Sequence, residues 1–296
     1  MEVQMTKKWQ HDYGLAARMF LTMFLLFVVY IVFIGILSYA GFGVVPIMFF
    51  AGIMLFAQYY YSDKMVLYST GARIVSESEA PQLHGIISRL CIEADLPKPR
   101  VAIVESSIPN AFATGRSPKK AVVAVTTSLL QRLNQNELEA VLAHELTHVK
   151  NRDVMVLTIA SFFSTIAFFL VRYLIFFGGG NRREGGSIML AWLASIVVWI
   201  ISSLLIRALS RYREFAADRG SAVITGHPSH LVSALLKISG AMERVPTDDL
   251  RKAEGMNAFY IIPISRSSIM ALFSTHPSLE KRIAALEKIS GRMEMR

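Results

Sequence analysis

The segment NQNELEAVLAHELTHVK, residues 134–150, has the pattern of a single amphipathic helix. Asn134 is placed to cap its start, and Glu137, three residues later, completes the pattern of a capping box. Its apolar face is formed by Leu138, Val141, Leu142 and Val149. We therefore expect a well-defined buried helix here. Its polar residues indicate which further groups a functional site would need from the rest of the chain.

His144 and His148 lie four residues apart, so a helix places them one above the other on the same face. Both imidazoles can then reach one metal ion, at about 2.0–2.1 Å for zinc. Glu145 is rotated by about 100° from His144, which directs it away from the ligand positions and toward a water on the ion. The pattern indicates a zinc hydrolase. The alternative is a pair of surface histidines, which is disfavoured because this face is not otherwise polar.

A catalytic zinc site needs a third protein ligand, and Glu214 is the best candidate. It follows an apolar hairpin that returns the chain to the membrane face it left, so Glu214 can come back beside the His144 helix. Asp218, four residues later, and Asp153 are candidates for accepting the outer ring N–H of a ligating histidine. An ion pair of Glu214 with Arg211 or Arg213 is the alternative.

Three further histidines could take part. His276 precedes Pro277 and the helix expected at 278–290, and it could hydrogen-bond a developing oxyanion, although its position favours a capping or packing role. His227 and His230, on either side of Pro228, are rival metal ligands in a polar turn.

The composition excludes a purely soluble or disordered protein. Of 296 residues, 53% are hydrophobic and 18% are charged, against about 25% charged in soluble domains. Three windows contain no Asp, Glu, Lys or Arg: residues 19–62, 154–171 and 185–206. Since about 20 apolar residues span a bilayer, we predict four spans. They lie at about 15–37, 44–61, 154–177 and 188–206.

The distribution of charge predicts the topology. Lys and Arg precede the first span and follow the second, so the positive-inside rule places the N-terminus and the segment after Tyr61 in the cytoplasm. The single cysteine agrees with a reducing compartment. A cleaved signal peptide and an interfacial hairpin at 154–206 are the alternatives. The net charge of +9 suits an anionic membrane surface, and the basic stripe with aromatics that nucleic-acid binding needs is missing.

The remaining residues predict a fold that is mainly α with a small β-sheet (α+β). Helices are expected at 80–94, 134–150, 229–239 and 278–290, and strands at 100–105 and 121–126, with 110–115 as an edge strand and 244–263 as a long loop. We divide the chain into an N-terminal pair of transmembrane helices (1–62), a first cytoplasmic part with the histidine helix (63–153), a second hairpin (154–206) and a second cytoplasmic part (207–296).

Together, several motifs resemble the HtpX membrane zinc metalloproteases, relatives of the CAAX prenyl endoproteases and other membrane gluzincins. The motifs are residues 109–115 (PNAFATG), 144–148 with Asn151 and Asp153, 213–218 (REFAAD), and 274–278 (STHPS) with Arg282. The resemblance implies a gluzincin-like domain on a four-helix membrane anchor. It implies one Zn²⁺ per chain held by His144, His148 and Glu214, with Glu145 as general base and Asp218 orienting a ligand.

The same resemblance implies cleavage of misfolded or damaged membrane proteins at the cytoplasmic side of the cell (inner) membrane, as part of stress response and protein quality control. It also implies that an edge strand pairs with the substrate backbone. That strand consists of Asn110, Ala111, Phe112, Ala113 and Thr114.

Three other functions compete with this interpretation. A CAAX-type prenyl-peptide endoprotease would share the site and differ in its substrate cavity. A protease acting within the bilayer is disfavoured by Arg132, Glu137, Glu139 and Lys150, which are too polar for a membrane span. A non-enzymatic membrane adaptor with structural zinc is disfavoured because such sites usually use cysteine, and Cys91 is far from the motif.

Overall fold

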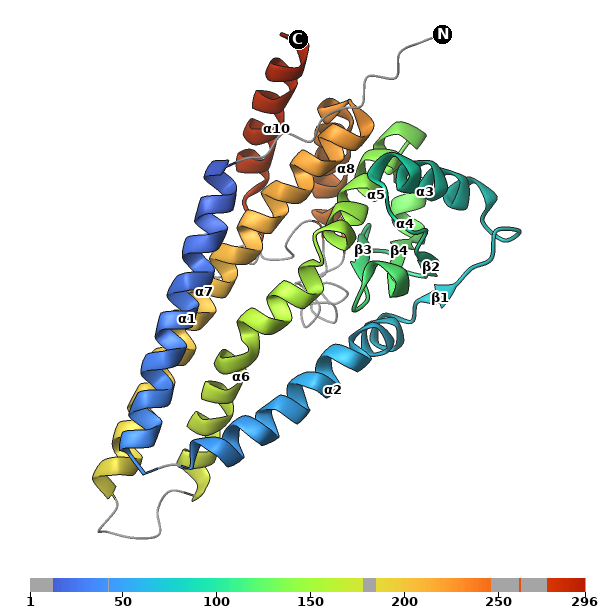
Figure 1. Ribbon diagram of the computed structural model, residues 1–296. Coiled ribbons are helices and arrows are strands. Elements are labelled where there is room, and N and C mark those ends of the chain that lie inside the picture. The colour runs from blue at the N-terminus through green and yellow to red at the C-terminus, as the bar shows by residue number, and fades with distance from the viewer. Residues whose placement is uncertain (1–12, 42, 178–184, 246–260, 262–275, 296) are drawn as a thin grey trace. The chain divides into compact units, whose positions relative to one another are not determined.

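The structure is a computed structural model that describes residues 13–41, 43–177, 185–245, 261 and 276–295. Within these residues the chain is mainly helical with one four-stranded sheet, which confirms the predicted α+β class (Figure 1). The chain divides into two compact units. The helical unit comprises Ala16–Tyr61 and Met155–Ser210, and the sheet unit is made mainly of Ser62–Val154 and Arg211–Arg296.

The helical unit is built from four helices: α1 (Tyr13–Tyr39), the first part of α2 (Val44–Thr70), most of α6 (Asp153–Phe177) and the first part of α7 (Gly185–Thr225). Leu26, Phe33 and Leu37 of α1 are buried against small residues of α6 and α7, such as Ala167 and Ala191. Small residues let helix backbones approach closely, which is how helices associate in lipid.

Among the described residues, three helices are long and apolar enough to cross a membrane: Tyr13–Tyr39, Asp153–Val171 and Gly186–Thr225. They contain the first and fourth predicted spans and most of the third. The second predicted span forms the first part of α2, where Phe49 and Phe56 are exposed. The basic residues before α1 and most of the glycine-rich hairpin tip lie outside the described residues. The last of the three helices, α7, does not end with its apolar part but continues to Thr225.

The sheet has the strand order β1-β2-β4-β3. β2 (Arg100–Val104) is parallel to β4 (Val122–Thr126), whereas β1 (Arg73–Ile74) and β3 (Ala111–Thr114) are antiparallel to their neighbours. β3 is therefore an edge strand, as the sequence predicts. Every residue of β4 is buried, because helices cover both faces of the sheet.

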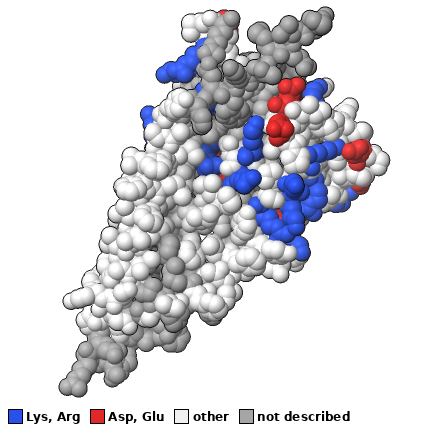
Figure 2. Space-filling model, viewed as in Figure 1, with Lys and Arg blue, Asp and Glu red and all other residues white. Residues whose placement is uncertain are grey.

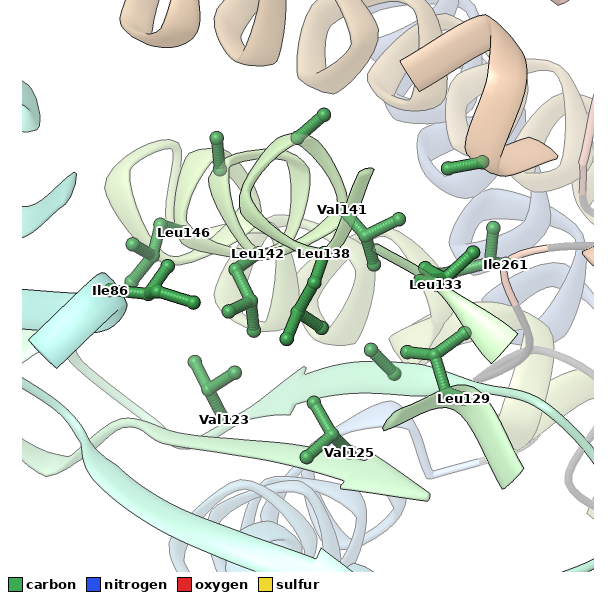
Figure 3. Packing of buried hydrophobic residues seen from close by; sticks show 14 of the residues in the cluster. Ile86, Val123, Val125, Leu129, Leu133, Leu138, Val141, Leu142, Leu146 and Ile261 are labelled. Carbon is green, nitrogen blue, oxygen red and sulfur yellow. The ribbon is translucent and has the colours of Figure 1, made fainter. Parts of the chain in front are cut away.

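The larger core lies between the sheet and α5 (Gln135–Lys150), with α3 (Pro81–Ala94) beside them. Leu138, Leu142 and Leu146 of α5 face Val123 and Val125 of β4 (Figure 3). A smaller cluster on the opposite face joins the second part of α2 to the sheet, and its buried members are Val66, Ala102, Val104, Phe112, Val122 and Ala124.

The start of α5 is fixed by the predicted capping box. The Glu137 amide donates to Oδ1 of Asn134 at 2.9 Å, and the Asn134 amide donates to Oε2 of Glu137 at 2.9 Å. The predicted helices at 229–239 and 278–290 are α8 (Pro228–Met242) and α10 (Leu279–Glu294). The sequence did not predict β1, the short α4 (Thr127–Arg132) or the 3₁₀ turn η1 (Pro118–Lys120). The predicted loop 244–263 lies mostly outside the described residues.

Candidate metal centre

Helices α5 and α7 bring two imidazoles and one carboxylate together in the sheet unit. The two Nε2 atoms of His144 and His148 are 3.1 Å apart. Oε2 of Glu214 lies 3.6 Å from Nε2 of His144, and Oε1 lies 3.5 Å from Nε2 of His148. These ligand atoms all lie within 4.8 Å of one another, and the three side chains are buried or half-buried.

The opposite nitrogen of each ring faces a carboxylate. Nδ1 of His144 is 3.0 Å from Oδ1 of Asp218, and Nδ1 of His148 is 2.7 Å from Oδ2 of Asp153. A carboxylate accepts hydrogen bonds, so each Nδ1 carries the proton in the neutral ring. Both Nε2 atoms are then unprotonated, with lone pairs directed at each other and at a third anionic group. A cation held between these atoms, a metal ion or a proton, stabilises such an arrangement.

The spacing of the donor atoms fits a transition metal ion. Tetrahedral ligands at about 2.0–2.1 Å from zinc are about 3.3 Å from one another. The separations of 3.1, 3.5 and 3.6 Å are close to this value. The two histidines and Glu214 would occupy three corners and leave the fourth open, which is the arrangement of a catalytic rather than a structural site.

Glu214 reaches this position because α7 packs directly on α5. A Cβ atom on Gly220 would lie 2.4 Å from the side chain of Thr147, which is buried in the turn of α5 that ends at His148. One residue further, the buried Ser221 hydroxyl donates to the Ala140 carbonyl at 2.6 Å. These contacts fix the register of the two helices, and Glu214 and Asp218 precede Gly220 on the same helix.

Each carboxylate behind a histidine is paired with a buried arginine. Arg282 of α10 holds Asp218 with two hydrogen bonds, Nε to Oδ2 at 2.9 Å and Nη2 to Oδ1 at 2.6 Å. Arg213 pairs with Asp153 and also donates to the Asn151 carbonyl at 2.8 Å. This fork geometry fixes the carboxylates, and they in turn fix the imidazole rings.

The electrostatics of the site favour a cation. Burial alone would lower the pKa of the His144 ring, but hydrogen bonds to Asp218 and Glu214 raise it above its ordinary value. The carboxylates that favour a proton on this ring also favour a metal ion beside it. Burial raises the pKa of the Glu145 carboxyl, and a cation held by the neighbouring rings would act in the opposite direction.

The other predicted site residues lie as follows. Nδ1 of His276 is 3.2 Å from Oε2 of Glu214, so this buried histidine borders the same carboxylate. Asn110 directly precedes β3, and its Oδ1 accepts from the Ile261 amide at 3.0 Å. The rings of His227 and His230 lie 4.9 Å from each other at the start of α8, and neither belongs to the metal-binding group found among the described residues.

The sequence analysis named Arg282 in a motif but gave it no role in the site, whereas its side chain is only 2% exposed and touches several groups there. Besides Asp218, it donates to the Ile261 carbonyl at 2.8 Å and approaches Oε2 of Glu214 at 3.7 Å. An arginine on the apolar side of the amphipathic helix 279–294 was the available signal, because such a residue needs a buried anionic partner.

The helix-borne histidine pair, the adjoining glutamates and the apolar helices define a membrane-anchored metalloprotease. The family model described as "Peptidase family M48" matches residues 77–290, which is most of the chain. Similar proteins include "Protease HtpX homolog 2" of Methanosarcina mazei, 68% identical over 98% of this chain and 100% of that protein. "Protease HtpX homolog" of Moorella thermoacetica is 60% identical over 99% of this chain and 100% of that protein.

The chain belongs to peptidase family M48 and, within it, to the HtpX proteases. The crystal structure of S. mikatae Ste24p has a similar fold, with a TM-score of 0.54 and 19% sequence identity. That similarity covers 87% of this chain and 61% of the Ste24p chain.

Proposed function

We propose that this metalloprotease is a zinc-dependent endopeptidase whose ion is held by His144, His148 and Glu214. The observation that carries the proposal is the pairing of both outer ring nitrogens with carboxylates, at 3.0 and 2.7 Å. It leaves two unprotonated nitrogens and one carboxylate facing the same point. Imidazole and carboxylate donors suit zinc among several divalent metals, so the identity of the metal needs a direct measurement.

Glu145 acts as the general base. When bound, the ion supplies Lewis-acid polarisation of the scissile carbonyl and makes an attacking water more acidic. Glu145 takes the proton from that water as its oxygen bonds to the carbonyl carbon, and it returns a proton to the leaving nitrogen when the C–N bond breaks. Glu145 is buried, which excludes competing water from its carboxylate.

Two further groups serve the substrate. β3 is an edge strand beside α5, so the backbone of an extended peptide can pair with Asn110–Thr114, which brings the scissile bond toward the His144 helix. His276 borders Glu214 and donates a hydrogen bond to the developing oxyanion.

The substrates are misfolded or damaged membrane proteins, and the sheet unit faces the cytoplasm. Basic residues on both sides of the α6–α7 hairpin support this orientation through the positive-inside rule. They are Lys150, Arg152, Arg207, Arg211 and Arg213. On this basis we place the protein in the cell membrane as a multi-pass protein.

The decisive experiment compares wild type with Glu145→Gln and Glu214→Ala in detergent. Zinc per chain is measured by elemental analysis, and cleavage is measured on unfolded casein with and without a chelator. Glu145→Gln is expected to keep about one zinc per chain and to lose about 10²- to 10⁴-fold in rate. Glu214→Ala is expected to lose both zinc and cleavage.

Two results would overturn the proposal. Normal casein turnover by Glu145→Gln would show that Glu145 is not the general base. Full zinc occupancy of Glu214→Ala would show that Glu214 is not the third ligand. Cleavage restricted to a prenylated C-terminal peptide, with casein untouched, would replace the endopeptidase of damaged proteins with a prenyl-peptide protease.

A further inference from the structure

One end of the sheet collects basic residues from separate segments of the chain. Arg100 is the first residue of β2, and it is paired in register with Val122 at the start of the parallel strand β4. Its amide donates to the Ala121 carbonyl at 3.0 Å. Lys119 and Lys120 form the exposed end of η1 immediately before Ala121. These three side chains therefore lie at the same end of the sheet.

The connection between β3 and β4 adds Arg116 to this end. Gly115 has a φ of +123°, and a Cβ atom there would lie 2.6 Å from the Lys120 carbonyl oxygen. Only glycine permits this close approach, which brings the chain at 115–116 against the chain at 120–121.

The second part of α2 packs on the adjoining face of the sheet and carries one more cation, Lys64, on the side of the helix that points away from the sheet. Asp63 approaches Arg100, with Oδ2 3.4 Å from Nη2, and Val66 is buried in the cluster below the sheet. At 100° per residue, Lys64, Met65 and Tyr68 point in the opposite direction. Met65 is 62% exposed and Tyr68 is 92% exposed.

We name two parts of this region. The basic surface consists of Lys64, Arg100, Arg116, Lys119 and Lys120, and the exposed stripe consists of Met65 and Tyr68. Asp63 contacts the basic surface through Arg100. On the face seen in Figure 2, a group of Lys and Arg side chains has few acidic side chains among them.

From this arrangement we infer that the basic surface and the exposed stripe together bind anionic lipid headgroups at the membrane–water interface. Cations at one end of the sheet, next to a helix whose outer side carries Lys64 with exposed apolar and aromatic side chains, have the chemistry of interfacial lipid binding. An acidic protein or a nucleic acid would match the cations but would leave Met65 and Tyr68 without an apolar environment.

The position of the basic surface and the exposed stripe along the chain also supports binding to lipid headgroups. α2 is one continuous helix, and its apolar segment ends in Tyr59, Tyr60 and Tyr61, the residue type that is enriched at membrane interfaces. Asp63, which touches Arg100, comes two residues later. A helix rises 1.5 Å per residue, so Lys64 lies about 4.5 Å along the helix axis from the last of these tyrosines.

The test uses the full chain with a fluorophore on the exposed stripe. Tyr68→Cys is labelled with bimane at pH 7. The native Cys91 is buried, and burial raises its pKa to about 11, so its thiol stays protonated and unlabelled. Ile92→Cys is the matched control, because residue 92 is 81% exposed and lies on α3 rather than on α2. Both are placed in nanodiscs of phosphatidylcholine alone or mixed equally with phosphatidylglycerol, each containing a headgroup nitroxide lipid as quencher.

Quenching at position 68 is expected to be at least about twofold stronger with phosphatidylglycerol than without it, and to fall toward the phosphatidylcholine value near 1 M salt. Position 92 is expected to show no such difference. Equal quenching at position 68 in both lipids, or equal responses at positions 68 and 92, would overturn the inference.

A charge reversal provides the second measurement. In the Tyr68→Cys chain, Lys119→Glu with Lys120→Glu is expected to remove the dependence on phosphatidylglycerol, since each basic side chain near an anionic surface changes partitioning about fivefold. Lys281→Glu with Lys288→Glu, on exposed positions of α10, makes the same change in net charge and is expected to leave it intact. If both pairs act alike, net charge rather than this surface is responsible, and the inference fails.

Discussion

Gly220 of α7 lies so close to Thr147 of α5 that a Cβ atom on it would be 2.4 Å from both Cγ2 and Oγ1 of that side chain. Thr147 cannot move aside, because it is fully buried and its hydroxyl donates to the Ala143 carbonyl at 2.8 Å. The neighbouring residue His148 and the preceding turns of α7 belong to the metal centre. The two helices can therefore pack this closely only because Gly220 has no side chain.

We predict that Gly220→Ala separates α7 from α5 and weakens both the fold and the metal centre. Overpacking of this kind costs about 1–3 kcal/mol. The thermal unfolding midpoint is expected to fall, and zinc affinity with it, because Glu214 moves with α7. Gly240→Ala is the matched control, since Gly240 is also inside a helix and a Cβ atom there would meet nothing within 4 Å. That change is expected to stabilise α8 by up to about 1 kcal/mol. Equal effects of the two substitutions would contradict the proposed close packing.

The local parts of the site could be predicted from the sequence because they depend on helix geometry alone. The histidine spacing and the capping box of Asn134 and Glu137 are properties of one helix, and the structure shows both. The position of Glu214 could be anticipated because an apolar hairpin has to return to the side of the membrane it left. The edge position of β3 was suggested by its place between two β-branched strands and by the family resemblance, and the strand order confirms it.

The parts that could not be predicted depend on tertiary packing. Arg282 reaches Asp218 from a helix 64 residues later in the chain, and nothing in the local sequence names its partner. The approach of Gly220 to Thr147 likewise requires two helices to be docked first. The continuation of α7 from its apolar part to Thr225 was missed because the change in composition at Arg207 resembles a boundary, although helix geometry does not depend on it.

Asp153 provides a test of how the carboxylates that face the Nδ1 atoms of the two histidines affect zinc affinity. Its Oδ2 lies 2.7 Å from Nδ1 of His148. Asp153→Asn keeps the shape but weakens the acceptor, so zinc affinity is expected to fall about 10- to 100-fold. Competition with a chromogenic chelator measures the affinity. Asp63→Asn is the control, because it changes a carboxylate on α2 that contacts Arg100, and it is expected to leave the zinc affinity unchanged. An unaltered zinc affinity in Asp153→Asn would show that the carboxylate does not orient the ring.

Arg282 and Asp218 are expected to stabilise the fold as a pair. Arg282→Met leaves the buried Asp218 without its two arginine hydrogen bonds, which costs about 3–5 kcal/mol for a buried ion pair broken on one side. For a chain of this size that corresponds to a fall of about 6 °C or more in unfolding temperature. The double variant Arg282→Met, Asp218→Asn removes both charges and is expected to recover part of the loss. A double variant that loses the full sum of the single effects would show that the two residues are not coupled.

Glu137 links stability to pH outside the metal centre. Burial alone would raise the pKa of this carboxyl, but hydrogen bonds from Lys237, Ser233 and the Asn134 amide lower it below its ordinary value. A carboxyl whose folded pKa is lowered stabilises the fold above its unfolded pKa of about 4.3, and this contribution is lost as pH falls through the folded pKa. Unfolding temperature should therefore depend on Glu137 at pH 6 and much less at pH 3.

The substitution Glu137→Gln isolates that charge, because glutamine at this position keeps the capping box. At pH 6 it is expected to cost about 1–2 kcal/mol, and the difference from wild type should shrink as pH falls below about 4.3. Glu139→Gln is the control, since its partner Arg89 is exposed and such pairs contribute about 1 kcal/mol or less. A Glu137→Gln penalty that stays constant from pH 6 to pH 3 would contradict the prediction, because it would show that the ionised charge of Glu137 does not stabilise the fold.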